Sequence, residues 1–167
     1  NLTPQQTEAV KTLSELRGFA PTLLYGVTGS GKTEVYIRCI QEQLLQQKSV
    51  LLLAPEIALT PQLEQRVKDQ FGPAVGMYHS KMTPAKRYKA WKQFRSGEIN
   101  ILIGTRSAAM MSAPKLGVII IDEEHDASYK QHEGFKFSAR DLAIKRAQML
   151  KIPIILGSAT PSLRTLR

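Results

Sequence analysis

The sequence predicts an α/β fold with an open, mainly parallel sheet that carries helices on both faces. Short apolar runs alternate with longer stretches of mixed polarity, which is the order of strands and helices in α/β proteins. Several runs, such as 50–54 and 118–121, are apolar at consecutive positions, as is typical of strands covered on both faces. Right-handed crossovers should then place helices on both sides of the sheet.

Local signals justify each element in chain order. Thr3, Thr60 and Thr83 each stand before a proline, which places an N-cap residue before the first helical position. Ser138 and Asp141 have the spacing of a capping box. Strands are expected at 22–25, 50–54, 74–78, 99–104, 118–121 and 154–157, and helices at about 4–17, 32–47, 60–70, 84–96 and 139–150.

The composition is that of one globular domain. The chain has 167 residues, of which 43% are hydrophobic and 22% charged, enough for a sizeable core. Its apolar runs are too short for a transmembrane helix. It begins with neither an initiator methionine nor a signal peptide, so we expect residues 1–167 to be a single domain cut from a longer chain. The single cysteine, Cys39, excludes an internal disulfide and a cysteine-cluster zinc site in this fragment.

The net charge of +9 is partly local. Residues 70–97 hold six cations and no acid, namely Lys81, Lys86, Arg87, Lys89, Lys92 and Arg95. Such a cluster indicates either a polyanionic partner, most often nucleic acid, or a solvated helix face. Charge alone leaves both interpretations open.

A phosphate-binding loop is predicted directly after strand 22–25. The stretch GVTGSGKT, residues 26–33, has the pattern G-x-x-x-x-G-K-T between a strand and a helix. Glycines let backbone N–H groups approach phosphate oxygens, and the helix N-terminus adds a positive field. An ordinary glycine turn is the weaker alternative in this context. The nucleotide-binding residues predicted for ATP are Gly26, Thr28, Gly29, Ser30, Gly31, Lys32, Thr33 and Glu34.

An acidic motif follows strand 118–121. We expect Asp122 to bind Mg²⁺ together with Thr33, and Glu123 to polarise the attacking water, so the predicted catalytic residues are Lys32, Asp122 and Glu123. An acidic helix cap is the alternative for the pair. Glu124 is either functional or a solvated or salt-bridged acid.

Hydroxyl residues follow the last predicted strand. Ser158 and Thr160 can hydrogen-bond to His125 or to the acidic motif. We expect His125 to be a hydrogen-bonded positioning residue. As the third element in this order, the stretch GSATP at 157–161 indicates a relay from nucleotide to nucleic acid.

These motifs resemble a known family. The patterns G-x-x-G-S-G-K-T, D-E-x-H and S-A-T are similar, in this order, to the first motor lobe of superfamily 2 helicases. The stretches APEIALTPQ, IGTRSA and DEEHDASYKQ resemble the primosomal replication-restart helicases over nearly the whole chain. The resemblance implies a RecA-like P-loop NTPase lobe, the first of two, in an ATP-dependent 3′-to-5′ DNA helicase of replication restart and primosome assembly.

The resemblance also implies partners. These are single-stranded and forked DNA, a second helicase lobe and DNA-binding domains of the longer chain, and primosome and single-strand-binding proteins. It implies a location in the bacterial cytoplasm, at the nucleoid, with no membrane. An arginine from the second lobe should stabilise the transition state. The lobe alone is therefore expected to bind nucleotide weakly, to hydrolyse it very slowly and not to unwind DNA.

Further residues take roles from the resemblance. Gln6 matches a glutamine that reads the adenine edge, although an exposed helix residue is an alternative. Residues 54–62 match motif Ia and 104–108 match motif Ib, which face DNA. The implied contacts to the DNA backbone are Thr60, Thr105, Arg106 and Ser107. Thr60 can also be an N-cap, and Arg106 can instead form an internal salt bridge.

The stretch after the acidic motif resembles an aromatic-rich loop. Tyr129, Phe135 and Phe137 are expected to stack on unpaired bases, with Arg140 among the nearby cations. The family pattern has tryptophan at the position of Phe135, and phenylalanine offers less area and no N–H donor. The alternative is that both phenylalanines belong to the core. Trp91, in the basic helix 84–96, is expected in the core.

Other function classes compete with the motor. A P-loop phosphotransferase explains residues 26–33 but not Arg106 or the 158–160 element. A related superfamily 2 DNA translocase is a further alternative, although related fork-remodelling helicases share the P-loop but continue differently after the acidic motif. A catalytically silent binding module predicts that Lys32→Ala leaves every activity unchanged.

Overall fold

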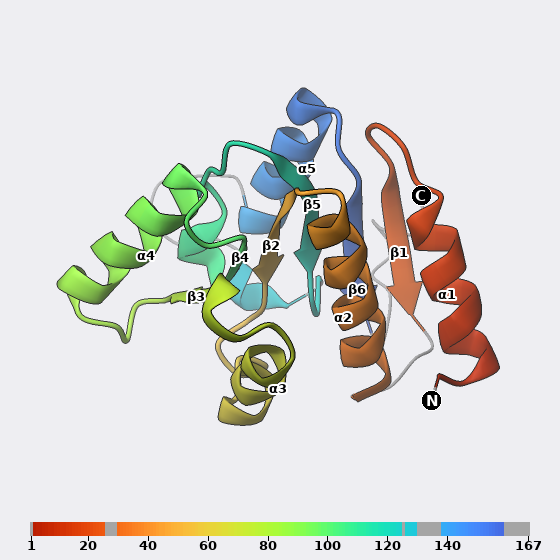
Figure 1. Cartoon of the computed structure of the whole chain (residues 1–167), viewed down its shortest axis with the longest axis horizontal. Coiled ribbons are helices and arrows are strands. Elements are labelled where there is room, and N and C mark those ends of the chain that lie inside the picture. Colours follow the sequence, from red (N-terminus) through yellow and green to blue (C-terminus); the bar gives the residue numbers. More distant parts are fainter. Residues whose placement is uncertain (1, 26–29, 125, 130–137, 159–167) are drawn as a thin grey trace.

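A six-stranded sheet runs through the centre of the computed structural model, which describes residues 2–25, 30–124, 126–129 and 138–158 (Figure 1). All its strand pairs are parallel, and the strand order is β1-β6-β5-β2-β4-β3. The predicted α/β fold with a parallel sheet is confirmed. The strands are β1 (Pro21–Tyr25), β2 (Ser49–Leu53), β3 (Val75–Tyr78), β4 (Ile101–Gly104), β5 (Leu116–Ile121) and β6 (Ile154–Ser158).

Helices cover both faces of the sheet (Figure 1). Helices α1 (Pro4–Ser14), α2 (Ser30–Leu45) and α3 (Pro61–Phe71) lie on one face, and α4 (Pro84–Ser96) and α5 (Ala139–Leu150) on the other. The short 3₁₀ turns are η1 (Gly72–Ala74), η2 (Arg106–Ala108) and η3 (Ala127–Tyr129). In the described part of the chain, no helix has the length and apolarity needed to cross a bilayer.

The predicted helix starts are confirmed by their caps. The side chains of Thr3, Thr60, Thr83 and Ser138 each accept a hydrogen bond from a backbone N–H in the first turn of their helix. Helix α1 ends at Ser14 instead of residue 17, because the N–H of Glu15 turns back to the carbonyls of Thr12 and Leu13.

Strand β2 shows why the central strands are apolar at every position. Leu51 and Leu53 belong to the core beneath α4 and α5, while Val50 and Leu52 belong to the core beneath α1, α2 and α3. All four are at most 1% exposed. Because successive side chains point to opposite faces, a strand between two helical layers must be apolar on both.

The strand ends lie level along one edge of the sheet. Tyr25 pairs with Ser158 in register, and Leu53 pairs with both Gly104 and Ile121. These strands therefore end at a common carboxyl edge of the sheet. In open α/β sheets this edge is where ligands bind.

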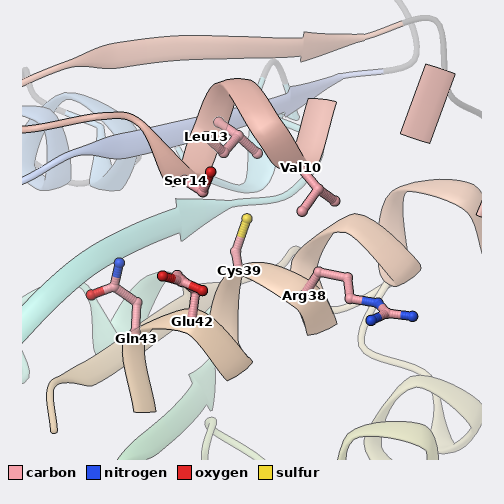
Figure 2. Close-up of a pocket in the computed structure, with 7 residues that line it drawn as sticks. All are labelled: Val10, Leu13, Ser14, Arg38, Cys39, Glu42 and Gln43. Atoms are coloured by element: carbon pink, nitrogen blue, oxygen red, sulfur yellow. The ribbon is translucent and has the colours of Figure 1, made fainter. Parts of the chain in front are cut away.

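A small pocket lies between α1 and α2 (Figure 2). Burial, and to a lesser extent the charge of Glu42, raises the pKa of the Cys39 thiol in this pocket to about 12. The thiol is therefore protonated at neutral pH, which indicates a structural role. The pocket is lined by Val10, Leu13, Ser14, Arg38, Cys39, Glu42 and Gln43.

We expect native Cys39 to react slowly with iodoacetamide at pH 8. Only the thiolate reacts, and a pKa of about 12 leaves on the order of one thiolate per ten thousand molecules. The rate should rise on the order of a thousandfold in denaturing urea. Mass spectrometry of the labelled chain reports on this residue alone, because Cys39 is its single cysteine. Equal rates with and without urea would contradict the buried thiol.

Candidate nucleotide-binding site

Three predicted catalytic residues meet at the carboxyl edge. Lys32 lies near the start of α2, and Asp122 and Glu123 follow β5 directly. The Lys32 Nζ lies 3.1 Å from Asp122 Oδ1 and donates a hydrogen bond to Glu123 Oε1. Lys32 is buried. The structure thus brings the P-loop lysine to two acids that are far away in the sequence.

The two carboxylates keep Lys32 charged. Burial by itself lowers the pKa of the ammonium, but the contacts with Glu123 and Asp122 outweigh this effect and hold the pKa above its ordinary value. Lys32 therefore stays positively charged and can bind an anionic ligand. A phosphate group that approached Lys32 would compete with Glu123 and Asp122 for the same N–H donors.

The backbone of the acidic motif is fixed by β2 and β6. The N–H of Asp122 donates to Leu53 O at 2.8 Å, and the N–H of Glu124 donates to Gly157 O at 2.9 Å. Between them Glu123 has a φ of 48°, in the left-handed region that non-glycine residues seldom adopt. Such local strain is typical of functional residues and is maintained by surrounding contacts.

Glu124 is a buried acid in an ion pair. It is 1% exposed, and Arg140 Nε donates to its Oε2 at 2.6 Å. Arg140 also contacts Asp141, with Nη1 at 2.9 Å from Oδ1. Of the two alternatives for a structural Glu124, the salt-bridged one is therefore correct. The pair joins the end of the acidic motif to the first turn of α5.

Gln6 belongs to the capping box of α1 and to its contact with α2. Its Oε1 accepts from Thr3 N at 2.7 Å, and its Nε2 donates to Gly31 O at 3.2 Å. The side chain is buried, so the alternative of an exposed helix residue is wrong. Gln6 lies beside the start of α2, and adenine recognition stays a prediction.

The remaining P-loop predictions lie in different surroundings. Thr33 is partly exposed in α2, where Ser30 is the first residue. Glu34 forms an ion pair with Arg66 of α3, which directs its carboxylate toward α3. Gly26, Thr28 and Gly29 lie outside the described residues.

The residues of the motif Ib stretch differ in accessibility. Thr105 is buried, which does not fit its predicted contact with a DNA phosphate. Arg106 and Ser107 are exposed, and Arg106 Nη1 donates to Ser128 O at 3.4 Å. Thr60 accepts from Leu63 N at 3.2 Å, so its predicted cap role is confirmed, and its DNA contact stays a prediction.

Base stacking by Tyr129 is contradicted by its burial in this structure. The ring is 1% exposed, and its hydroxyl donates to Asp122 O at 2.6 Å. An aromatic side chain beside alternating charges looks like a base-stacking residue in sequence, but here it packs beneath the acidic motif.

Ser158 is buried at the end of β6. His125, Phe135, Phe137 and Thr160 lie outside the described residues.

Helix α4 places its aromatic residues differently from the prediction. Ala90 and Phe94 enter the core, whereas Trp91 is only partly buried. The Arg95 guanidinium carbon lies 5.2 Å from the centre of the Trp91 ring, a cation–π distance. Tyr88 beside it is 59% exposed. The surface of α4 therefore combines aromatic and basic groups.

Sequence reasoning missed Tyr36 altogether. Its hydroxyl donates to Asp122 Oδ1 at 2.7 Å. The available signal was its position four residues after Lys32, which puts both side chains on the same face of α2. That signal is weak, because the same face of the helix also supplies ordinary core residues.

Comparisons with solved structures agree with the fold. RecG bound to a three-way DNA junction gives a TM-score of 0.70 at 24% identity, covering 99% of this chain and 22% of that one. The Pyrococcus furiosus Hef helicase domain gives a TM-score of 0.63 at 19% identity, covering 96% of this chain and 34% of that one. At such low identity these matches show the fold alone, and the predicted RecA-like fold is confirmed.

Curated relatives are closer in sequence. Replication restart protein PriA of Haemophilus influenzae is 50% identical over 165 residues, which cover 99% of this chain and 23% of that protein. The protein of the same name from Synechocystis sp. is 48% identical over 165 residues, covering 98% of this chain and 20% of that protein. The chain thus spans about a fifth of the length of these relatives.

The family model described as DEAD/DEAH box helicase matches residues 3–167. Such a domain implies that ATP is bound with a metal ion. Because the match includes both the lysine loop and the acidic motif that meet at the carboxyl edge, the chain belongs to the DEAD/DEAH box helicase family.

Proposed function

We propose that this chain is the ATP-binding motor lobe of a 3′-to-5′ DNA helicase that acts in replication restart and primosome assembly. The contact of Lys32 with Asp122 and Glu123 carries the proposal, since it joins the phosphate-binding lysine to acids suited to a metal and a water. The similarity to proteins named Replication restart protein PriA supports the cellular role.

Each residue of the site has a distinct part. Lys32 would bind the β- and γ-phosphates and exchange its carboxylate partners for them. The Thr33 hydroxyl and the Asp122 carboxylate are hard oxygen ligands suited to Mg²⁺, which neutralises phosphate charge when bound. Glu123 would orient the attacking water and accept its proton.

Two contacts would couple the state of the bound nucleotide to the residues that face DNA. One is the Glu124–Arg140 ion pair, which connects the acidic motif with α5. The other is the bond from Arg106 to Ser128, which connects the motif Ib stretch with η3. We propose His125, Thr160, Phe135 and Phe137 as further members of this path, on the strength of the family resemblance.

Residues 1–167 would work with parts of a longer protein. A second helicase lobe would supply an arginine to the transition state, and further domains would hold single-stranded and forked DNA. Primosome and single-strand-binding proteins are the proposed protein partners, and the bacterial nucleoid in the cytoplasm is the proposed location. The bacterial origin of the similar curated proteins supports this placement.

The deciding experiment measures the ATPase rate of the full-length protein with and without DNA. We expect single-stranded or forked DNA to stimulate hydrolysis, and Lys32→Ala to abolish the stimulated rate. A rate that DNA leaves unchanged would contradict the motor function. Phosphate transfer to a small-molecule acceptor in a screen without DNA would instead support a phosphotransferase, and an unaltered rate in Lys32→Ala would support a silent binding module.

A further inference from the structure

Two buried tyrosine hydroxyls converge on Asp122 from different elements. Tyr36 of α2 donates to the side-chain Oδ1 at 2.7 Å, and Tyr129 of η3 donates to the main-chain carbonyl at 2.6 Å. Their residues are 3% and 1% exposed. Together with the bond from Asp122 N to Leu53 O, these contacts hold both the backbone and the carboxylate of one residue.

Both phenols act as donors in this arrangement. Tyr36 donates its hydroxyl proton to the Asp122 carboxylate, and Tyr129 donates its own to the main-chain carbonyl of the same residue. A phenol that donates to a carboxylate makes a charge-assisted bond, which is stronger than a neutral one.

Strand β6 has a glycine, Gly157, where the Tyr36 hydroxyl packs against it. A Cβ added at Gly157 would overlap with that hydroxyl oxygen and would lie 3.2 Å from Asp122 Oδ1. The hydroxyl thus occupies the volume that any other residue at 157 would fill. The Tyr36 hydroxyl therefore reaches Asp122 through space that Gly157 leaves open.

The bonds select one oxygen of the carboxylate. Tyr36 and Lys32 both contact Oδ1 of Asp122, and neither bond uses Oδ2. We propose that Tyr36 and Tyr129 are positioning residues which lock Asp122 so that Oδ2 is presented to the metal ion of the nucleotide. This inference rests on the proposed function of Asp122 and adds the residues that orient it.

The test is Tyr36→Phe in the full-length protein, which removes one oxygen and keeps the ring. The readouts are the Mg²⁺ concentration at half-maximal binding of a fluorescent ATP analogue, the affinity for that analogue in EDTA, and the thermal midpoint. We expect the Mg²⁺ midpoint to rise by about tenfold or more, as for other partners that orient metal ligands. Binding in EDTA should change by less than about twofold, since Asp122 contributes through the metal.

Two more variants complete the test. Tyr88→Phe is the matched control, because it removes the same hydroxyl oxygen from a tyrosine that is exposed on α4. It should leave the Mg²⁺ midpoint unchanged. Tyr129→Phe should raise the midpoint in the same direction as Tyr36→Phe, and it replaces that variant if Tyr36→Phe does not fold. Gly157→Ala should raise the midpoint in the wild-type background and less so in Tyr36→Phe, where the overlapping oxygen is gone.

The outcomes separate this inference from the proposed function. If the wild-type protein binds the analogue in a Mg²⁺-dependent way and both tyrosine variants keep its midpoint, the positioning role is overturned and the proposed function stands. If the wild-type protein shows no Mg²⁺-dependent binding, the proposed function fails first. A lower thermal midpoint with an unchanged Mg²⁺ midpoint would assign the hydroxyls to stability alone and would also overturn the proposal.

Discussion

Glu123→Gln in the full-length protein is expected to lower the DNA-stimulated kcat for ATP by about 10²- to 10⁴-fold, the usual contribution of a general base. Glutamine keeps the size of the side chain but cannot accept a proton from water. Nucleotide binding should persist and become somewhat tighter. The reason is that Glu123 shares the Lys32 ammonium, and its neutralisation leaves that cation freer to bind phosphate. Steady-state hydrolysis and titration with a fluorescent ATP analogue measure the two effects.

Two further variants serve as comparisons for Glu123→Gln. Lys32→Ala should weaken nucleotide binding as well as hydrolysis, because it removes the phosphate ligand itself. Glu98→Gln changes an exposed acid between α4 and β4 and should leave both quantities unchanged. If Glu123→Gln keeps kcat within about threefold of the wild type, a value far below the contribution of a general base, Glu123 does not activate the water.

Arg140→Ala is expected to reduce the free energy of unfolding by about 3–5 kcal/mol, the usual cost of removing one partner from a buried ion pair. Glu124 is 1% exposed, and its carboxylate would lose the 2.6 Å contact with Arg140. The buried carboxylate would then lack the guanidinium that contacts it in this structure. Urea denaturation of the 167-residue chain measures the change.

Helix α3 offers a matched control for this loss. Lys68 and Glu64 form an exposed pair with a distance of 2.8 Å and the i, i+4 spacing. Lys68→Ala should cost no more than about 0.5 kcal/mol, since exposed pairs of this spacing contribute little. If Arg140→Ala costs no more than Lys68→Ala, the Glu124–Arg140 pair does not stabilise the fold. A second comparison is Arg140→Lys, which keeps the positive charge but loses the planar guanidinium. Its loss of free energy of unfolding should lie between those of Arg140→Ala and Lys68→Ala.

The sequence by itself determined the features that depend on near neighbours. The helix starts at Thr3, Thr60 and Thr83 follow from N-caps next to prolines, and their physics is complete within four residues. The strands follow from short apolar runs. The meeting of Lys32 with the acidic pair also followed from the sequence, because parallel strands carry their carboxyl ends to one edge of the sheet.

Only the tertiary structure decided what surrounds these residues. The strand order inserts β6 between β1 and β5, and this insertion brings Gly157 to the Tyr36 hydroxyl and to Asp122. It also decided that Tyr129 is buried and that Glu124 pairs with Arg140. A charged or aromatic residue looks the same in the sequence whether its side chain is buried or exposed. Its burial is decided when strands and helices that are distant in the sequence pack over the side chain and exclude water. No local pattern encodes that packing.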